Sequence, residues 1–308
     1  MTPELRREID KLTPEVVANA RKIWEINETW PITGTRHILN LDGRDIGMVF
    51  YKAPSDNAPL FVAYHGGGFL FGGSAFDDEL FSYMSRALNV NIATVNYRQG
   101  PDYKDYTSLN DCYDSILFLI DHAAEYGFNP KHISTIGASA GGNLAAAVAL
   151  KANATKEFML DNQILLYPFL DGYTEPEEKG TGSFSNVMSH IMNETHFSGG
   201  RSNDPYLSPV FATRDMLVGL PNAIVVHSDN DNLKYEAIKY AEMLKDANVP
   251  TEVFFAENMP HGYIESGFKS ELTPVDREFF GPSVALFDSG EIHKSSVATV
   301  EFIKEHMI

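Results

Sequence analysis

A glycine-rich segment of five residues, Gly137-Ala138-Ser139-Ala140-Gly141, constrains the fold of this chain more than any other feature. It follows the β-prone residues 133–136 and precedes residues 143–150, a run of Ala, Leu and Val that favours helix. A sharp strand-to-helix turn is therefore predicted at residues 137–142. The backbone of Ser139 is strained in such a turn, so the residues two before and two after it must be tiny, as Gly137 and Gly141 are. The turn directs the hydroxyl of Ser139 outward and places the N–H of Ala140 in the first helical turn, where unpaired N–H groups favour negative charge.

A second glycine segment, His65-Gly66-Gly67-Gly68, follows the apolar run at residues 60–64. The bare backbone of such a loop can donate hydrogen bonds to an oxyanion that develops next to a nucleophile. We interpret His65 and Gly66 as support for this loop. The two glycine segments together predict a nucleophilic serine that faces backbone donors, which is typical of serine hydrolases.

A histidine and an acid that suit this serine occur downstream, in the order Ser, Asp, His of α/β-hydrolases. The apolar run at residues 223–226 leads into a loop that holds Asp229 and Asp231. The next apolar run leads to Pro260-His261-Gly262, a tight loop suited to a base that reaches back to Ser139. Both loops follow predicted strands, and open α/β sheets bind ligands at the carboxyl ends of their strands. His261 is the predicted base; spacing alone does not choose between Asp229 and Asp231.

Strand and helix patterns alternate along most of the chain and predict an α/β fold with a mostly parallel central sheet and helices on both faces. Together with the two glycine segments and the order Ser, Asp, His, this indicates an α/β-hydrolase fold, for which we expect a helical cap. Asp42-Gly43 predicts a hairpin within residues 34–52. Further strands are predicted near residues 60–64, 91–96, 132–136, 162–167, 223–228 and 251–256, with one helix ending near Asp246 and a closing helix at residues 297–308.

The predicted organisation has N-terminal cap helices at residues 1–33 and a catalytic domain at residues 34–308. Residues 1–28 are expected to form two helices, the second with Thr13 as N-cap and Pro14 in its first turn. An insertion at about residues 171–205 is polar and irregular, and we expect it to complete the cap over Ser139; a plain surface loop is the alternative. The aromatic residues within 264–290 are expected to pack on the body; the alternatives are that they border the pocket or a dimer surface. The sequence leaves the oligomeric state open, and a homodimer is one alternative.

Composition excludes several classes of function. The chain of 308 residues has 24 basic and 42 acidic side chains and a formal charge of −18, which argues against nucleic-acid partners and against stable association with anionic membranes. Because Cys112 is the single cysteine, an internal disulfide is excluded. We expect Cys112 to lie on a helix and to pack against neighbouring residues. Because the first ten residues are charged and no stretch reaches transmembrane length, we expect a cytoplasmic protein. No metal-ligand spacing or phosphate loop occurs, so we expect no metal and no cofactor.

The chain resembles the hormone-sensitive-lipase family of α/β-hydrolase esterases from about Pro59 to His261. The resemblance rests on His65-Gly66-Gly67-Gly68-Phe69, Asn96-Tyr97-Arg98, Asp111-Cys112-Tyr113, Gly137–Asn143, Ser208-Pro209-Val210-Phe211 and Met259-Pro260-His261-Gly262. The family's Asp-Pro-Leu segment, with a Glu three residues after the Leu, corresponds to Asp231-Asn232-Leu233 with Glu236. Two departures are Ala138, where relatives carry Asp or Glu, and Asn96, where they carry Asp.

The resemblance implies a catalytic triad of Ser139, Asp231 and His261, with Asp231 rather than Asp229 as the acid. It also implies that Gly67 and Gly68 join Ala140 as the three oxyanion donors. The implied activity is that of a carboxylesterase for small uncharged esters with short acyl, acetyl or aryl-acyl groups. We expect a preference for acyl groups of up to about eight carbons over long chains. The alternative is a receptor that binds a small ligand on a hydrolase scaffold without turnover.

Overall fold

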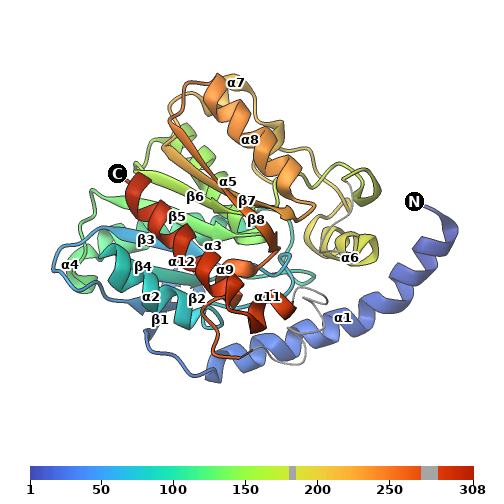
Figure 1. Cartoon of the computed structure of the whole chain (residues 1–308), viewed down its shortest axis with the longest axis horizontal. Coiled ribbons are helices and arrows are strands. Elements are labelled where there is room, and N and C mark those ends of the chain that lie inside the picture. Colours follow the sequence, from blue (N-terminus) through green and yellow to red (C-terminus); the bar gives the residue numbers. More distant parts are fainter. Residues whose placement is uncertain (180–184, 272–283) are drawn as a thin grey trace.

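The structure is a computed structural model that describes residues 1–179, 185–271 and 284–308. Within these residues, an eight-stranded sheet has the order β1-β2-β4-β3-β5-β6-β7-β8 (Figure 1). The strand β2 is antiparallel to β1, with the predicted Asp42-Gly43 between them, and to β4; the other pairs are parallel. The prediction of a mostly parallel sheet is confirmed. The strands are β1 (Thr35–Leu41), β2 (Arg44–Tyr51), β3 (Leu60–Tyr64), β4 (Asn91–Asn96), β5 (Ile133–Ala138), β6 (Asn162–Leu166), β7 (Asn222–Asn230) and β8 (Thr251–Pro260).

Helices cover both faces of this sheet because successive strand residues point to opposite sides. In β3, Leu60, Val62 and Tyr64 belong to one apolar core, and Phe61 and Ala63 belong to the other. The first core is covered by α3 (Tyr106–Asp121), α5 (Ala140–Thr155) and α8 (Lys234–Asp246), and the second by α2 (Asp78–Leu88), α9 (Tyr263–Ser266) and α12 (Glu291–His306). The segments that connect these helices and strands contain the short helices α4 (Ala123–Tyr126), α7 (Arg214–Leu217) and α11 (Val284–Asp288) and the 3₁₀ turns η1 (Pro176–Glu178) and η2 (Pro209–Phe211).

The N-terminal segment forms one helix, α1 (Pro3–Thr29), so the prediction of two helices is wrong. The N-cap is Thr2, whose hydroxyl accepts a hydrogen bond from the N–H of Leu5 at 3.2 Å. Thr13 lies within the helix, where its hydroxyl donates to the carbonyl of Ile9 at 2.7 Å. Pro14, which lacks an N–H, costs the helix one backbone hydrogen bond without ending it.

Tertiary packing explains why α1 continues through the proline. Ile9 and Ala20, on either side of Pro14, are fully buried in one apolar cluster with Leu70 and Ile191. Ile191 belongs to α6 (Asn186–His196), and Figure 1 shows α6 beside α1 at one end of the molecule. Burial of a single apolar face along both halves outweighs the local preference for a break.

The insertion predicted as cap contains η1 and α6. The first turn of α6 is capped by Ser185, whose hydroxyl accepts a hydrogen bond from the N–H of Met188 at 3.2 Å. An ion pair between Arg6 of α1 and Glu194 of α6 links the insertion to the N-terminal helix. The described part of the insertion is therefore an ordered element packed on α1.

The aromatic residues after His261 pack on the body where the structure describes them. Phe268 contacts the ring of Tyr83 at 4.6 Å between centroids, and Phe287 is half-buried against the second core. Leu272, Phe279 and Phe280 lie outside the described residues. Cys112 is buried in α3, as expected. Among the helices that the structure describes, none has the length and apolar character needed to cross a membrane.

Candidate active site

Ser139 occupies a strained turn between β5 and α5. Its φ of 55° and ψ of −116° lie outside the regions that residues with a side chain usually adopt. The neighbouring glycines leave no room for a side chain: a Cβ on Gly137 would lie 2.1 Å from the carbonyl oxygen of Gly141, and a Cβ on Gly141 would lie 1.9 Å from that of Tyr64. The turn therefore depends on both glycines, and it holds the side chain of Ser139 at the carboxyl end of β5.

The glycine loop after β3 lies against this turn. A Cβ on Gly66 would be 3.6 Å from the Cβ of Ser139. Gly67 and Gly68 both have positive φ, 114° and 62°, which glycine adopts readily. In the part of the chain that the structure describes, the backbone N–H groups of Gly67, Gly68 and Ala140 donate to no acceptor. Three backbone donors are thus available close to Ser139.

His65 supports the glycine loop from inside the protein. Its Nδ1 donates to the carbonyl of Gly66 at 2.7 Å. Its ring stacks on that of Tyr97 with 4.3 Å between the centroids and an interplanar angle of 11°. The hydroxyl of Tyr97 in turn donates to the carbonyl of His65 at 2.8 Å. Burial lowers the pKa of His65 to about 4. The imidazole is therefore neutral near pH 7 and braces the loop through hydrogen bonding and stacking.

A buried carboxylate fixes the turn after Tyr97. Asp111 of α3 accepts hydrogen bonds from the guanidinium of Arg98 at 2.9 Å and from its backbone N–H at 3.0 Å. Asp111 also accepts from Arg44 of β2 at 2.8 Å. At Asn96, where relatives carry Asp, the side-chain oxygen accepts from the N–H of Ser74 at 3.4 Å. These contacts hold Tyr97 in place to stack on His65.

His261 and Asp231 contact each other at the ends of the last two strands. Their Nδ1 and Oδ2 atoms are 2.6 Å apart, and both residues are buried. The other carboxylate oxygen of Asp231 accepts from the N–H of Leu233 at 2.9 Å. Strand pairing explains this contact. β7 and β8 extend beyond their predicted ends until Asn230 pairs with Pro260. Asp231 directly follows Asn230 and His261 directly follows Pro260, so the two residues leave the sheet side by side.

Asp229, the other acid in this loop, has different surroundings. Lys234 donates to its backbone carbonyl at 2.6 Å. Its Oδ1 is buried and has no hydrogen-bond partner among the described residues. Of the two acids that spacing left open, Asp231 is the one in contact with the imidazole of His261.

The loop after β6 connects Ser139 to the histidine. The N–H of Ser139 donates to the carbonyl of Leu166, and its carbonyl accepts from the N–H of Phe169, both at 2.9 Å. Tyr167, between these two residues, places its ring 4.9 Å from that of His261. Ser139 and His261 thus both contact a single short segment, residues 166–169, at the carboxyl edge of the sheet.

A pocket opens beside Ser139, between the sheet edge and the insertion. Its empty volume, including the mouth that is open to solvent, is about 510 Å³. The body contributes one wall and the insertion the other. The lining residues are Gly68, Phe69, Ser139, Phe169, Asn232 and Leu233 from the body, and Pro176, Lys179, Ser189, Met192 and Asn193 from the insertion.

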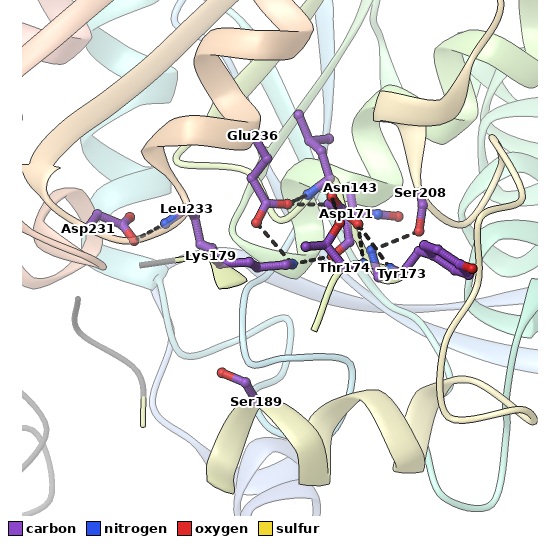
Figure 2. A network of polar contacts seen from close by, with 12 residues as sticks. Asn143, Asp171, Tyr173, Thr174, Lys179, Ser189, Ser208, Asp231, Leu233 and Glu236 are labelled. Atoms are coloured by element: carbon purple, nitrogen blue, oxygen red, sulfur yellow. Dashed lines mark hydrogen bonds and ion pairs between the residues drawn. The ribbon is translucent and has the colours of Figure 1, made fainter. Parts of the chain in front are cut away.

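An ion pair joins the two walls (Figure 2). The ammonium of Lys179 donates to the Glu236 carboxylate at 3.3 Å and to the carbonyl of Asp171, and it lies 4.7 Å from the ring centroid of Phe169. Glu236 also accepts from the backbone N–H groups of Leu170 and Asp171. Burial raises the pKa of the Glu236 carboxyl. Sequence reasoning identified Glu236 through the family motif but missed Lys179, since no local pattern marks a lysine whose partner lies 57 residues away.

One cluster of side chains in the described residues has the composition of a metal site. The ligand atoms of Glu175, Glu177 and His190 lie within 4.8 Å of one another. Nε2 of His190 lies 3.0 Å from a carboxylate oxygen of Glu177. The carboxylate of Glu175 forms an ion pair with the guanidinium of Arg201 at 2.7 Å. These partners account for the cluster without an ion.

Comparison with known proteins agrees with this architecture. A family model described as alpha/beta hydrolase fold matches residues 61–265, and the chain therefore belongs to the α/β-hydrolase family related to hormone-sensitive lipase. The predicted fold class and family are confirmed.

The matched relatives include enzymes named for ester hydrolysis. An arylesterase from Saccharolobus solfataricus is 27% identical over 88% of this chain and 87% of its own length. The carboxylesterase NlhH from Mycobacterium tuberculosis is 28% identical over 78% of this chain and 77% of its own. Among solved structures, the thermostable carboxylesterase EstE1 from a metagenomic library has a TM-score of 0.72 and 27% identity, and the match covers 92% of this chain and 97% of that one.

Proposed function

We propose that the protein is a serine carboxylesterase that acts on small uncharged carboxylic esters through Ser139, His261 and Asp231. The observation that carries the proposal is the buried contact between Asp231 and His261, at the same sheet edge as the strained Ser139 and three backbone N–H groups that have no acceptor among the described residues. The carboxylesterases and the arylesterase among the relatives support the same reaction.

The reaction follows from these groups. Nε2 of His261 takes the proton of Ser139 as its Oγ attacks the ester carbonyl, while Asp231 holds the Nδ1–H tautomer and stabilises the imidazolium. The tetrahedral oxyanion accepts hydrogen bonds from Gly67, Gly68 and Ala140, each worth about 3 to 4 kcal/mol in the barrier. The alcohol leaves with the proton from His261, and an acyl group stays on Ser139. Water then repeats the sequence and releases the acid.

Hydrolysis of p-nitrophenyl butyrate tests the proposal. Ser139→Ala should abolish turnover while the variant still melts as a folded protein. Binding of the ester with no turnover by the unmodified protein would contradict the proposal and support the receptor alternative.

A matched pair of variants tests the acid. Asp231→Asn should lower kcat by about a thousand-fold or more, because the amide no longer holds the required tautomer of His261. Asp229→Asn should change kcat little, since the hydrogen bond that the structure describes for the imidazole is with Asp231. The opposite ranking would reassign the acid.

The cellular setting is also part of the proposal. We propose a cytoplasmic enzyme with a small-molecule substrate; the charge of −18 argues against a nucleic-acid partner and against stable association with anionic membranes. Cell fractionation that finds the protein with membranes would contradict this part alone.

A further inference from the structure

The wall of the pocket beside Ser139 includes a buried amide whose oxygen has no hydrogen-bond partner among the described residues. Asn232 lines the pocket and is 6% exposed, and its Oδ1 makes no hydrogen bond with any described residue. It follows Asp231 directly and stands where the resembling family has proline. The amide is thus a polar group of this chain at a position where the family motif carries none.

An unpaired buried carbonyl is costly, because its lost hydration is not replaced. A half-turn about χ2 exchanges the oxygen and nitrogen of an asparagine amide with little change in shape, so Asn232 can offer an acceptor or a donor to a ligand. Ser189 and Asn193, which line the facing wall on α6, add a hydroxyl and a second amide. Since Oδ1 is closed to solvent in the structure, this half-turn is what would present the oxygen to a ligand, and a plain alkyl group in the pocket gives the amide no partner in either orientation.

The charges around the pocket favour an uncharged ligand group. The Lys179 ammonium is neutralised by Glu236, and its other contacts are the carbonyl of Asp171 and the ring of Phe169. Asp231, which precedes Asn232 in the sequence, adds a carboxylate that is paired with His261. A ligand carboxylate would find no unpaired cation among these described residues, whereas a hydroxyl can both accept from and donate to an amide.

We propose that Asn232 determines specificity for esters that carry a hydroxyl group in the half of the molecule that occupies this pocket. This inference rests on the proposed esterase function and narrows its substrate class. The hydroxyl belongs either to the acyl half or to the alcohol half of the ester, and the two arms of the experiment distinguish these sources.

Two pairs of esters that differ only by hydroxyl in place of methyl test the inference. The acyl arm compares methyl 3-hydroxybutyrate with methyl 3-methylbutyrate, and the alcohol arm compares 2-hydroxyethyl butyrate with propyl butyrate. Acid release in a pH-stat gives kcat/KM, and each value is divided by the rate of alkaline hydrolysis of the same ester to remove intrinsic reactivity. An apolar pocket would favour the methyl member of each pair, since burial of a methyl group is favourable.

The unmodified enzyme should prefer the hydroxyl member in one arm by about ten-fold or more, because a site built to bind a hydroxyl penalises its absence. Asn232→Leu should remove that preference, which is the ratio of kcat/KM within a pair of esters, so a general change in activity of the variant does not affect the result. Asn232→Pro, which restores the family motif and also lacks the amide, is the second variant if the first does not fold. Ser189→Ala, on the facing wall, should reduce the preference by a smaller factor.

The outcomes separate this inference from the esterase function. Hydrolysis of p-nitrophenyl butyrate without a hydroxyl preference in either arm overturns the inference and leaves the esterase in place. A preference that survives in both Asn232 variants also overturns it. If no ester is hydrolysed, the esterase function fails and the inference fails with it.

Discussion

The buried imidazole of His65 makes the stability of this protein depend on pH in a way that can be isolated. His65 is 4% exposed, and burial lowers its pKa to about 4. In the unfolded chain the pKa of histidine is about 6.5, so the unfolded state binds this proton at a higher pH than the folded state does. The contribution of His65 to the free energy of unfolding is therefore present above about pH 6.5 and declines as the pH falls towards 4.

The size of the effect follows from the two pKa values. A group with pKa values of about 6.5 unfolded and about 4 folded lowers the free energy of unfolding by about 1.3 kcal/mol between pH 7.5 and pH 5.5. The chain has an isoelectric point of about 4.9, so work above pH 5.5 keeps it charged and soluble. The predicted change is well above the error of a comparison between two variants.

Urea unfolding of the unmodified protein and of His65→Asn at both pH values measures this change. Asparagine keeps an N–H near the position of Nδ1 that can donate to Gly66, and it does not titrate. Loss of the stack on Tyr97 lowers stability by the same amount at each pH, so the difference between the two pH values reports the imidazole alone. The unmodified protein should lose about 1.3 kcal/mol more than the variant on acidification. Equal losses in both proteins would refute the assignment of His65 as a buried neutral support.

The remaining predictions concern backbone strain and packing. Gly67→Ala should lower the free energy of unfolding by about 3 kcal/mol or more, because φ is 114° and the new Cβ would lie 2.2 Å from a backbone carbonyl oxygen. Gly68→Ala should lower it by about 1 to 2 kcal/mol, since the three atoms nearest to its Cβ belong to the movable side chain of Met192. Thermal melting of both variants checks this order, and equal shifts would contradict it. Ile9→Ala should lower stability by about 2 to 5 kcal/mol, because Ile9 is fully buried between α1 and α6, while Ile26→Ala on the exposed face should change it by less than about 0.5 kcal/mol. Similar melting temperatures for these two variants would show that α1 does not pack on the body.

Much of the fold was predictable from the sequence because it depends on local rules. The steric demand of a strand-to-helix turn required Gly137 and Gly141 around Ser139, and alternating apolar runs predicted the parallel sheet with helices on both faces. The Asp42-Gly43 hairpin and the helix ending at Asp246 follow equally local signals. These features depend on residues that are close together in the sequence, so neighbouring side chains and backbone preferences are enough to predict them.

Other features required the tertiary structure. The spacing of Asp229 and Asp231 could not show which acid meets His261, because that contact depends on how far β7 and β8 stay paired. Local propensity predicted a break at Pro14, but burial against distant residues keeps α1 continuous.

The pocket shows the same division between local and distant information. The motifs in the sequence predicted Ser139 as the nucleophile and the glycine loop as the source of hydrogen-bond donors beside it. Only the folded chain brings Lys179 to Glu236 and leaves Oδ1 of Asn232, a pocket residue, with no hydrogen-bond partner among the described residues. The physical reason is that hydrogen bonding and burial at this site are set by residues far apart in the chain, whose distances no local pattern records.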